Sequence, residues 1–275
     1  TLLGNDIKDI SNIFNEESEI NKKIKNAKKP IFIIGESALE LNNSKYILEK
    51  IKYFLIENNF INETWNALNI LSQNASTVGA LDLGFYNIDK NNNFIFFDKI
   101  KNNEFKLLYL VGSDNLEIKK NDQFIIYQGS HGDKNASIAD VVLPGATYTE
   151  QNGLFENLEG RIQECKKASY PTNQALEDWK IFNLINYNLN NSNLFSDILS
   201  IRKLILQEIP NFSEIGLLPR NSQPTKKNTL LEVVSEKIKI RDIDYYFSNS
   251  IARASKTMSD CRSISGDIKK NGTDN

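Results

Sequence analysis

Residues 106–112 read KLLYLVG, residues 122–128 read DQFIIYQ and residues 139–144 read ADVVLP. Each run is a short apolar stretch of strand length that ends in a polar or glycine-containing loop. Strands of this kind are typical of parallel sheets, in which both faces are covered. The three runs therefore predict neighbouring strands of a parallel sheet, and the loops that follow them are expected to gather at one end of it.

The chain before these strands continues the pattern. Residues 31–35, which follow Pro30, form a continuous apolar run that predicts another strand buried on both faces. Apolar residues at helical spacing predict a helix from about residue 44 to 56, and a second helical stretch is predicted over about 66–75, with a loop over 79–84. This alternation indicates an α/β fold with a doubly wound, mostly parallel sheet.

The chain changes character after Pro144. Residues 149–163 are polar and punctuated by glycine, and amphipathic helices are predicted from Glu177 to about Asn190 and over about 195–209. The sequence accordingly predicts an entry segment over residues 1–29, an α/β domain over 30–210 that ends in a helical extension, and an irregular, extended tail over 211–275.

Composition excludes several classes of function. The net charge of −2, from 33 basic and 35 acidic residues, excludes a nucleic-acid binder that works by bulk electrostatics. No apolar run reaches the roughly 18–20 residues of a membrane helix, so direct membrane insertion is not expected. Asn, Ile and Lys supply 98 of the 275 residues, and their A/T-rich codons indicate either a genome of low G+C content or an organellar gene.

Cysteine and histidine offer little for metal chemistry. Cys165, Cys261 and His131 show no CxxC or HExxH spacing, so no metal site is predicted, and free thiols are favoured over a disulfide. His131 with Asp133 suggests acid–base chemistry. No GxSxG motif accompanies the pair, so a loop-ordering histidine is favoured.

The sequence contains neither a GxGxxG motif after its first strand nor a GxxxxGK[ST] motif. Loops 112–115 and 129–133 could hold a nucleotide through aspartates and main-chain groups, or their glycines simply allow the turns to form. Acidic residues with one arginine also follow the third strand: Glu150, Glu156, Glu159 and Arg161. They could form an acid–base group, but a solvated cluster, or one that pairs with Arg161 to order a loop, is favoured. No catalytic, cofactor-binding or metal-binding residue is assigned.

One segment carries a specific family pattern. ADVVLP at residues 139–144 is followed by Glu150, Gly153, Asn157, Glu159-Gly160-Arg161 and Gln163. This resembles the molybdopterin oxidoreductase family, in which ADVVLP precedes E-x-x-G-T-x-x-N-x-E-G-R-x-Q. Leu154 stands where that pattern has Thr.

Further segments resemble one branch of that family, the large iron–sulfur subunit of respiratory complex I (the G-subunit type). They are residues 28–39, 80–84, 124–133, 177–180 and 250–258. The resemblance reaches from near residue 1 to about residue 262 and covers the carboxyl-terminal, molybdopterin oxidoreductase-like half of such a subunit. The chain begins at Thr1 and its single methionine is Met258, which indicates a processed product, a piece of a longer protein such as a split subunit, or a renumbered chain.

The resemblance implies a non-catalytic structural part of the matrix-side peripheral arm of mitochondrial NADH:ubiquinone oxidoreductase, at the inner membrane. Iron–sulfur clusters are then expected in the amino-terminal half or in a partner chain, and molybdopterin is expected to be lost. The partners would be other peripheral-arm subunits, especially the chain that carries the iron–sulfur domain. This chain would have no active site of its own and would carry no electrons.

Two other functions are kept as alternatives. The chain could be a fragment of a catalytic molybdenum or tungsten bis-pterin oxidoreductase such as a formate dehydrogenase, although the match at residues 250–258 argues against this. It could instead be an unrelated nucleotide-binding α/β enzyme. A pocket at loops 112–115 and 129–133 that holds a nucleotide would support the second alternative.

Overall fold

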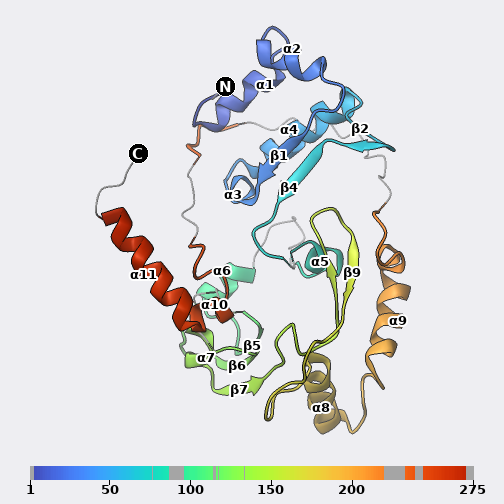
Figure 1. Cartoon of the computed structure of the whole chain (residues 1–275), viewed down its shortest axis with the longest axis vertical. Helices are drawn as coiled ribbons and strands as arrows, with labels where there is room; N and C mark the ends of the chain where they lie inside the picture. The colour runs from blue at the N-terminus through green and yellow to red at the C-terminus, as the bar shows by residue number, and fades with distance from the viewer. Residues whose placement is uncertain are drawn as a thin grey trace. The chain divides into compact units, whose positions relative to one another are not determined.

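A computed structural model of the chain describes residues 3–75, 77–86, 96–113, 116, 118–132, 134–219, 233–238 and 244–270, with only the backbone described for residues 96 and 267–270. The chain forms two compact units (Figure 1). Unit 1 contains residues 1–82, 156–163 and 214–242, and unit 2 contains residues 83–155, 164–213 and 243–275.

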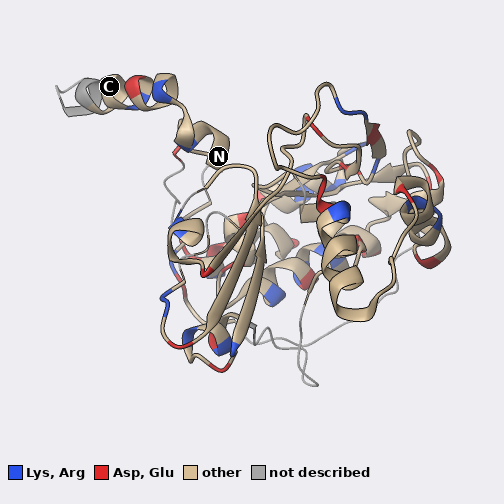
Figure 2. Cartoon of the chain, turned by 90° about the horizontal axis from the view of Figure 1, so that it is seen from below, with Lys and Arg blue, Asp and Glu red and all other residues tan. Residues whose placement is uncertain are grey.

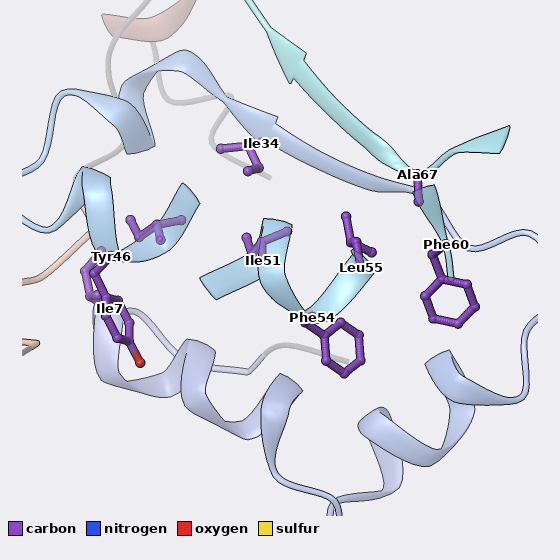
Figure 3. Close-up of a cluster of buried hydrophobic side chains, with 9 residues drawn as sticks. Ile7, Ile34, Tyr46, Ile51, Phe54, Leu55, Phe60 and Ala67 are labelled. Carbon is purple, nitrogen blue, oxygen red and sulfur yellow. The ribbon is translucent and has the colours of Figure 1, made fainter. Parts of the chain in front are cut away.

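Unit 1 is built on a two-stranded parallel sheet and one long helix. Strand β1 (Phe32–Gly35) pairs with β4 (Leu68–Leu71), with Phe32 opposite Leu68. Helix α4 (Ser44–Glu57) confirms the predicted helix, because Ile47, Ile51 and Leu55 recur every four residues and form its buried face. Figure 3 shows the core they form, with Ile7, Ile34, Tyr46, Phe54, Phe60 and Ala67.

The amino-terminal residues belong to this core. Helices η1 (Ile7–Ile10), α1 (Ser11–Phe14) and α2 (Glu19–Lys25) follow one another, and Ile7 is fully buried. The Ile7 main-chain N–H donates to the carbonyl of Glu236 at 3.0 Å, and the Ile238 N–H donates to the carbonyl of Asn5 at 2.8 Å. Residues predicted as an entry segment are thus tied to residues near the end of the chain.

Two local predictions in unit 1 are wrong. The helical stretch predicted over 66–75 is occupied by β4, after a short hairpin of β2 (Ile61–Asn62) and β3 (Trp65–Asn66). The apolar run at Leu68 is too short to distinguish the helical from the strand period, and pairing with β1 decides the outcome. The loop predicted over 79–84 contains most of helix α5 (Thr77–Asp82), and a further short helix, α3 (Glu36–Leu39), follows β1.

The strand at residues 31–35 was predicted to be buried on both faces, and this is wrong within the described chain. Ile34 is 5% exposed, but Ile31 is 56% exposed and Ile33 is 62% exposed. Successive side chains of a strand point to opposite faces, so one face of the β1–β4 sheet packs on α4 and the other is open.

Unit 2 contains the three strands predicted from the apolar runs. β5 (Leu107–Val111), β6 (Phe124–Gly129) and β7 (Val141–Pro144) form a parallel sheet in the order β5-β6-β7. None of the residues in these three strands is charged, so the strands are coloured tan in Figure 2. One face packs against helices α6 (Phe96–Lys101) and α7 (Lys134–Ile138), around the core residues Ile100, Leu108, Leu110, Ile125 and Tyr127. The predicted α/β class with parallel sheets is confirmed.

The remaining elements are mostly helical. α8 (Asp178–Asn190) and α9 (Ile198–Glu208) confirm the two predicted helices, and η2 (Pro210–Ser213) follows them. Residues 149–163, which the sequence showed to be polar, contain β8 (Gly153–Glu156) and the start of β9 (Ile162–Cys165), which form a hairpin. The chain passes from unit 2 to unit 1 within β8 and returns to unit 2 within β9. Helices α10 (Ser250–Ala254) and α11 (Lys256–Lys270) lie near the end.

The two units differ from the predicted division at residues 29 and 210. Residues 214–242 belong to unit 1, whereas residues 243–275 belong to unit 2. Composition along the chain does not reveal which distant segments pack together, so it missed this division. None of the described helices has the length and apolar character that crossing a bilayer requires.

Leu55→Ala is predicted to lower the free energy of unfolding of unit 1 by about 2–5 kcal/mol, because the fully buried side chain leaves a cavity. Urea unfolding followed by Trp65 fluorescence in a Trp179→Phe background measures the change. Val234→Ala is the control: Val234 lies in the same unit but is 70% exposed, so a change within about 0.5 kcal/mol is expected. Equal losses in both variants would contradict the assignment of the core.

Candidate functional site

The carboxyl ends of β5, β6 and β7 border a cavity of about 620 Å³ in unit 2. Its walls include Gly112 after β5, Gly129 at the end of β6 and Thr147 after β7. The sequence predicted that the loops after these strands gather at one end of the sheet, and the cavity confirms it for their described residues. Asp114, Asn115 and Asp133, which belong to the predicted loops, lie outside the described residues.

The end of the chain also lines this cavity. Ile251 and Ala252 of α10, together with Ser255 and Met258, form part of its wall. The Asn249 side chain accepts a hydrogen bond from the Ala252 main-chain N–H at 2.8 Å, which caps the start of α10. The segment that resembles the complex I subunit at residues 250–258 is therefore a wall of the cavity at the sheet end.

A partly buried network of hydrogen bonds joins three residues of the cavity wall, Gln128, Gln151 and Asp178, to Tyr109. The Tyr109 hydroxyl donates to Gln128 Oε1 at 2.5 Å, and Gln128 Nε2 donates to Asp178 Oδ1 at 2.7 Å. Gln151 Nε2 donates to Asp178 Oδ2 at 3.1 Å, and the Asp178 main-chain N–H donates back to Gln151 Oε1. Gln128 is fully buried, and burial together with the negative charge of Asp178 raises the pKa of Tyr109.

The sequence reasoning missed this network, because its members lie on β5, β6, α8 and the loop before β8. The sequence feature that could have indicated the network is Gly145, which follows β7. A Cβ atom at Gly145 would lie 3.0 Å from Asp178 Oδ1, a tight contact that would push the carboxylate by a few tenths of an ångström. The ring of Phe182 stacks on Tyr109 with 5.7 Å between centroids, which fixes the first turns of α8 on the sheet.

His131 lines a second cavity, of about 570 Å³, with Glu150 and residues 172–175. Its Nδ1 is 3.1 Å from Ser130 Oγ, and its main-chain carbonyl accepts a hydrogen bond from the Tyr127 hydroxyl at 3.1 Å. These contacts agree with the loop-ordering role favoured from the sequence. The predicted pairing with Asp133 falls on a residue that is not described.

The acidic residues after β7 do not share one set of contacts. Glu150 accepts a hydrogen bond from the Thr147 main-chain N–H, and Arg161 donates to the carbonyl of Gly216 at 3.1 Å. The turn between β8 and β9 is ordered by Asn157, whose side chain accepts from the main-chain N–H groups of Glu159 and Arg161. In this turn the side chain that orders the loop is therefore an asparagine, whereas the sequence analysis considered an ion pair with Arg161 for that role.

Glu156 stands apart from the other acidic residues. It is 6% exposed, and its side chain is hydrogen-bonded to that of Asp82 at the end of α5. Burial, with the charge of Asp82 as a second cause, raises the pKa of Glu156 to about 7. A Cβ atom at Gly79 would lie 3.4 Å from Glu156 Cβ, so the helix passes close to the carboxyl group.

The described linings of the two sheet-end cavities offer no basic side chain to a phosphate-bearing pterin. Such a cofactor needs basic side chains or free main-chain N–H groups around its phosphates. Neither sheet-end cavity has a Lys or Arg among its described lining, and each contains a carboxylate, Asp178 in one and Glu150 in the other. Within the described ranges no cluster of three or more His, Cys, Asp or Glu could hold a metal, and Cys165 and Cys261 are free thiols.

The fold and the sheet-end cavities define an α/β protein of the class that binds ligands at the carboxyl ends of parallel strands. Within that class, the chain belongs to the molybdopterin oxidoreductase family, whose pattern matches residues 1–186. The predicted resemblance to this family is confirmed.

Curated proteins are similar in sequence to this chain over most of its length. A 75 kDa subunit of NADH-ubiquinone oxidoreductase from Reclinomonas americana is 34% identical over 95% of the chain. A mitochondrial 78 kDa subunit from Candida albicans is 35% identical over 97%, and a bacterial NADH-quinone oxidoreductase subunit from Rickettsia bellii is 34% identical over 98%. The chain spans only 38%, 37% and 38% of these three proteins, respectively.

The Gln128–Asp178 hydrogen bond is predicted to couple the two residues by about 0.5–3 kcal/mol in a double-mutant cycle of Gln128→Ala and Asp178→Ala. Each single variant leaves a buried polar group without its partner. Urea unfolding followed by circular dichroism gives the four free energies. A control cycle of Gln128→Ala with Glu164→Ala is expected to be additive, because Glu164 pairs with Arg202. Additivity in the first cycle would refute the network.

The stability of unit 1 is predicted to fall as the pH rises from about 4.5 to about 7. Glu156 has a raised pKa, so the folded state binds its proton more tightly than the unfolded state and loses that advantage as the pH passes about 7. The loss is roughly 1–3 kcal/mol. It is measured as the difference between wild type and Glu156→Gln in unfolding experiments at several pH values.

The matched control for this pH dependence is Glu159→Gln, because Glu159 is exposed and lies in the adjacent turn. That variant is expected to keep the wild-type slope. A Glu156→Gln variant with an unchanged slope would show that the carboxyl group titrates normally in the folded state.

Proposed function

We propose that this chain is a non-catalytic structural part of the peripheral arm of NADH:ubiquinone oxidoreductase, where it supports the iron–sulfur electron-transfer module. The single observation that carries the proposal is the set of relatives named as subunits of that enzyme, at 34–35% identity over 95–98% of the chain. They favour this role over the alternative of a formate dehydrogenase fragment.

The proposed role includes the loss of molybdopterin. Two carboxylates and a set of neutral polar groups stand at the sheet ends, where phosphates would need basic partners. The polar floor of the larger cavity is bonded internally, because both carboxylate oxygens of Asp178 already accept hydrogen bonds from glutamine amides. These observations support a domain that keeps the family fold without the cofactor.

The proposed partners are other subunits of the same enzyme, and above all the chain or chain segment that carries the iron–sulfur domain. The proposed location is the matrix side of the mitochondrial inner membrane, as part of a membrane complex. The Candida albicans relative is named as mitochondrial, and the A/T-rich residue usage agrees with an organellar gene. Residues 211–275 are proposed to contact neighbouring subunits with the surfaces they leave exposed.

The test is purification through an affinity tag on this chain in its own organism. The expected result is co-purification with NADH:ubiquinone oxidoreductase activity and with iron, and molybdenum and tungsten far below one atom per chain by elemental analysis. Stoichiometric molybdenum or tungsten that tracks the chain would overturn the loss of cofactor. A chain that purifies apart from NADH:ubiquinone oxidoreductase would overturn the proposed role.

A further inference from the structure

Two carboxyl groups meet inside unit 1. Glu156, at the end of β8, is 6% exposed, and Asp82, at the end of α5, is exposed. Their side chains are hydrogen-bonded to each other. A carboxylate only accepts hydrogen bonds, so a bond between two carboxyl groups requires that one of them carries a proton. The contact between α5 and β8 therefore contains a shared proton.

The backbone brings α5 close to this pair. A Cβ atom at Gly79 would lie 3.4 Å from Glu156 Cβ and 3.8 Å from Glu156 Oε2. Asp82 comes three residues after Gly79, so the two lie on the same face of the helix. The turn between β8 and β9 approaches the other carboxyl oxygen, because a Cβ atom at Gly160 would lie 3.6 Å from Glu156 Oε1. The carboxyl group thus lies between α5 and that turn.

The charged groups around the pair leave Asp82 as the charge that acts on Glu156. Asp82 is the only charged residue of α5, and Glu156 is the only charged residue of β8. In the turn and in the segment that pairs with β9, Glu159 and Glu214 are exposed, and Arg161 donates to a main-chain carbonyl. No described basic group lowers the pKa of Glu156.

Loss of the shared proton makes the contact repulsive. Neither carboxylate can then donate to the other, and like charges lie side by side. In that state Glu156 Oε2 is buried and has no hydrogen-bond partner among the described residues. A buried charge and a buried acceptor without a donor both cost free energy. Water reaches the ionised carboxylate only when one of the neighbouring elements moves away.

Helix α5 is the element that is held more weakly. It has six residues, far fewer than an isolated helix needs to be stable, and none of its residues is buried. Leu81, next to Asp82, is 49% exposed. The turn on the other side is ordered by two hydrogen bonds to the Asn157 side chain. Ionisation of Glu156 is therefore relieved by movement of α5.

The pair also stands where the chain passes between the two units. Asp82 is the last residue of unit 1 before the chain enters unit 2, and Glu156 is the first residue of unit 1 after the chain returns. The hydrogen bond between them thus joins, inside unit 1, the two ends of the stretch over residues 83–155.

We infer that Asp82 and Glu156 form a proton-dependent latch, in which a shared proton fastens the end of α5 to β8 and loss of that proton releases α5. Burial, with the charge of Asp82 as a second cause, raises the pKa of Glu156 to about 7. The latch is therefore closed in acid and opens as the pH rises through about 7. This local device does not depend on the proposed function.

Hydrogen exchange of the full chain between pH 6 and pH 8, followed by mass spectrometry, tests the latch. Protection factors correct for the intrinsic pH dependence of exchange. In the wild type, the protection of the α5 amides is expected to fall about tenfold, from a pKa of about 7 in the latched state and the ordinary 4.5 in the released state. The α4 amides are expected to be better protected at every pH, because release of α5 is a local opening.

Glu156→Gln is the decisive variant, because its neutral amide donates to Asp82 at every pH. Its α5 protection is expected to change less than about twofold between pH 6 and pH 8. Glu159→Gln, which removes an exposed carboxylate from the adjacent turn, is the matched control and is expected to keep the tenfold fall.

Three results would overturn the latch. They are a wild-type α5 whose protection does not fall, a Glu156→Gln variant that keeps the tenfold fall, and equal protection of α5 and α4, which would mean that the whole unit opens. Circular dichroism checks that each variant folds. If Glu156→Gln does not fold, the carbon-13 shift of the Glu156 carboxyl group in the wild type decides, because a titration midpoint near 4.5 would refute the shared proton.

Discussion

The hydrogen bond from Gln128 to Asp178 is the interaction on which unit 2 depends. Gln128 is fully buried at the end of the central strand, so its amide must find partners inside the protein. Tyr109 on the neighbouring strand supplies the donor and Asp178 at the start of α8 supplies the acceptor. The network thus fixes the position of α8 on the sheet and fills the sheet end with groups that are bonded to one another.

This arrangement supports the proposed loss of the family's cofactor. At the carboxyl ends of parallel strands, ligand-binding proteins leave polar groups free to meet a ligand. Here the glutamines hold the only carboxyl group among the described residues of the larger cavity. The late segment adds an apolar wall, with Ile251 of α10 and Met258 of α11. The same polar residues that could have bound a ligand instead join β6, α8 and the loop before β8.

The strands of unit 2 and the helices α4, α8 and α9 could be predicted from the sequence, because each carries a clear apolar period over its own length. The period failed at Leu68, where four residues fit a helix and a strand equally and the partner strand lies more than thirty residues earlier. Nothing local marked Ile7 as a core residue. The site followed the same rule: the strand-end loops were predictable, whereas the Gln128–Asp178 contact joins residues fifty positions apart.

The contact between the two ends of unit 1 has a consequence for synthesis. Ile7 donates to Glu236 and Ile238 donates to Asn5, so the core of this unit closes only when residues far apart in the chain meet. Translation proceeds at about 5–20 residues per second, so the amino-terminal helices wait roughly 12–50 seconds for their final partners. During that interval Ile7 and the apolar face of α4 are incompletely covered. Folding of unit 1 therefore cannot finish before residues 236–238 have been synthesised, and its long-range contacts are among the last to form.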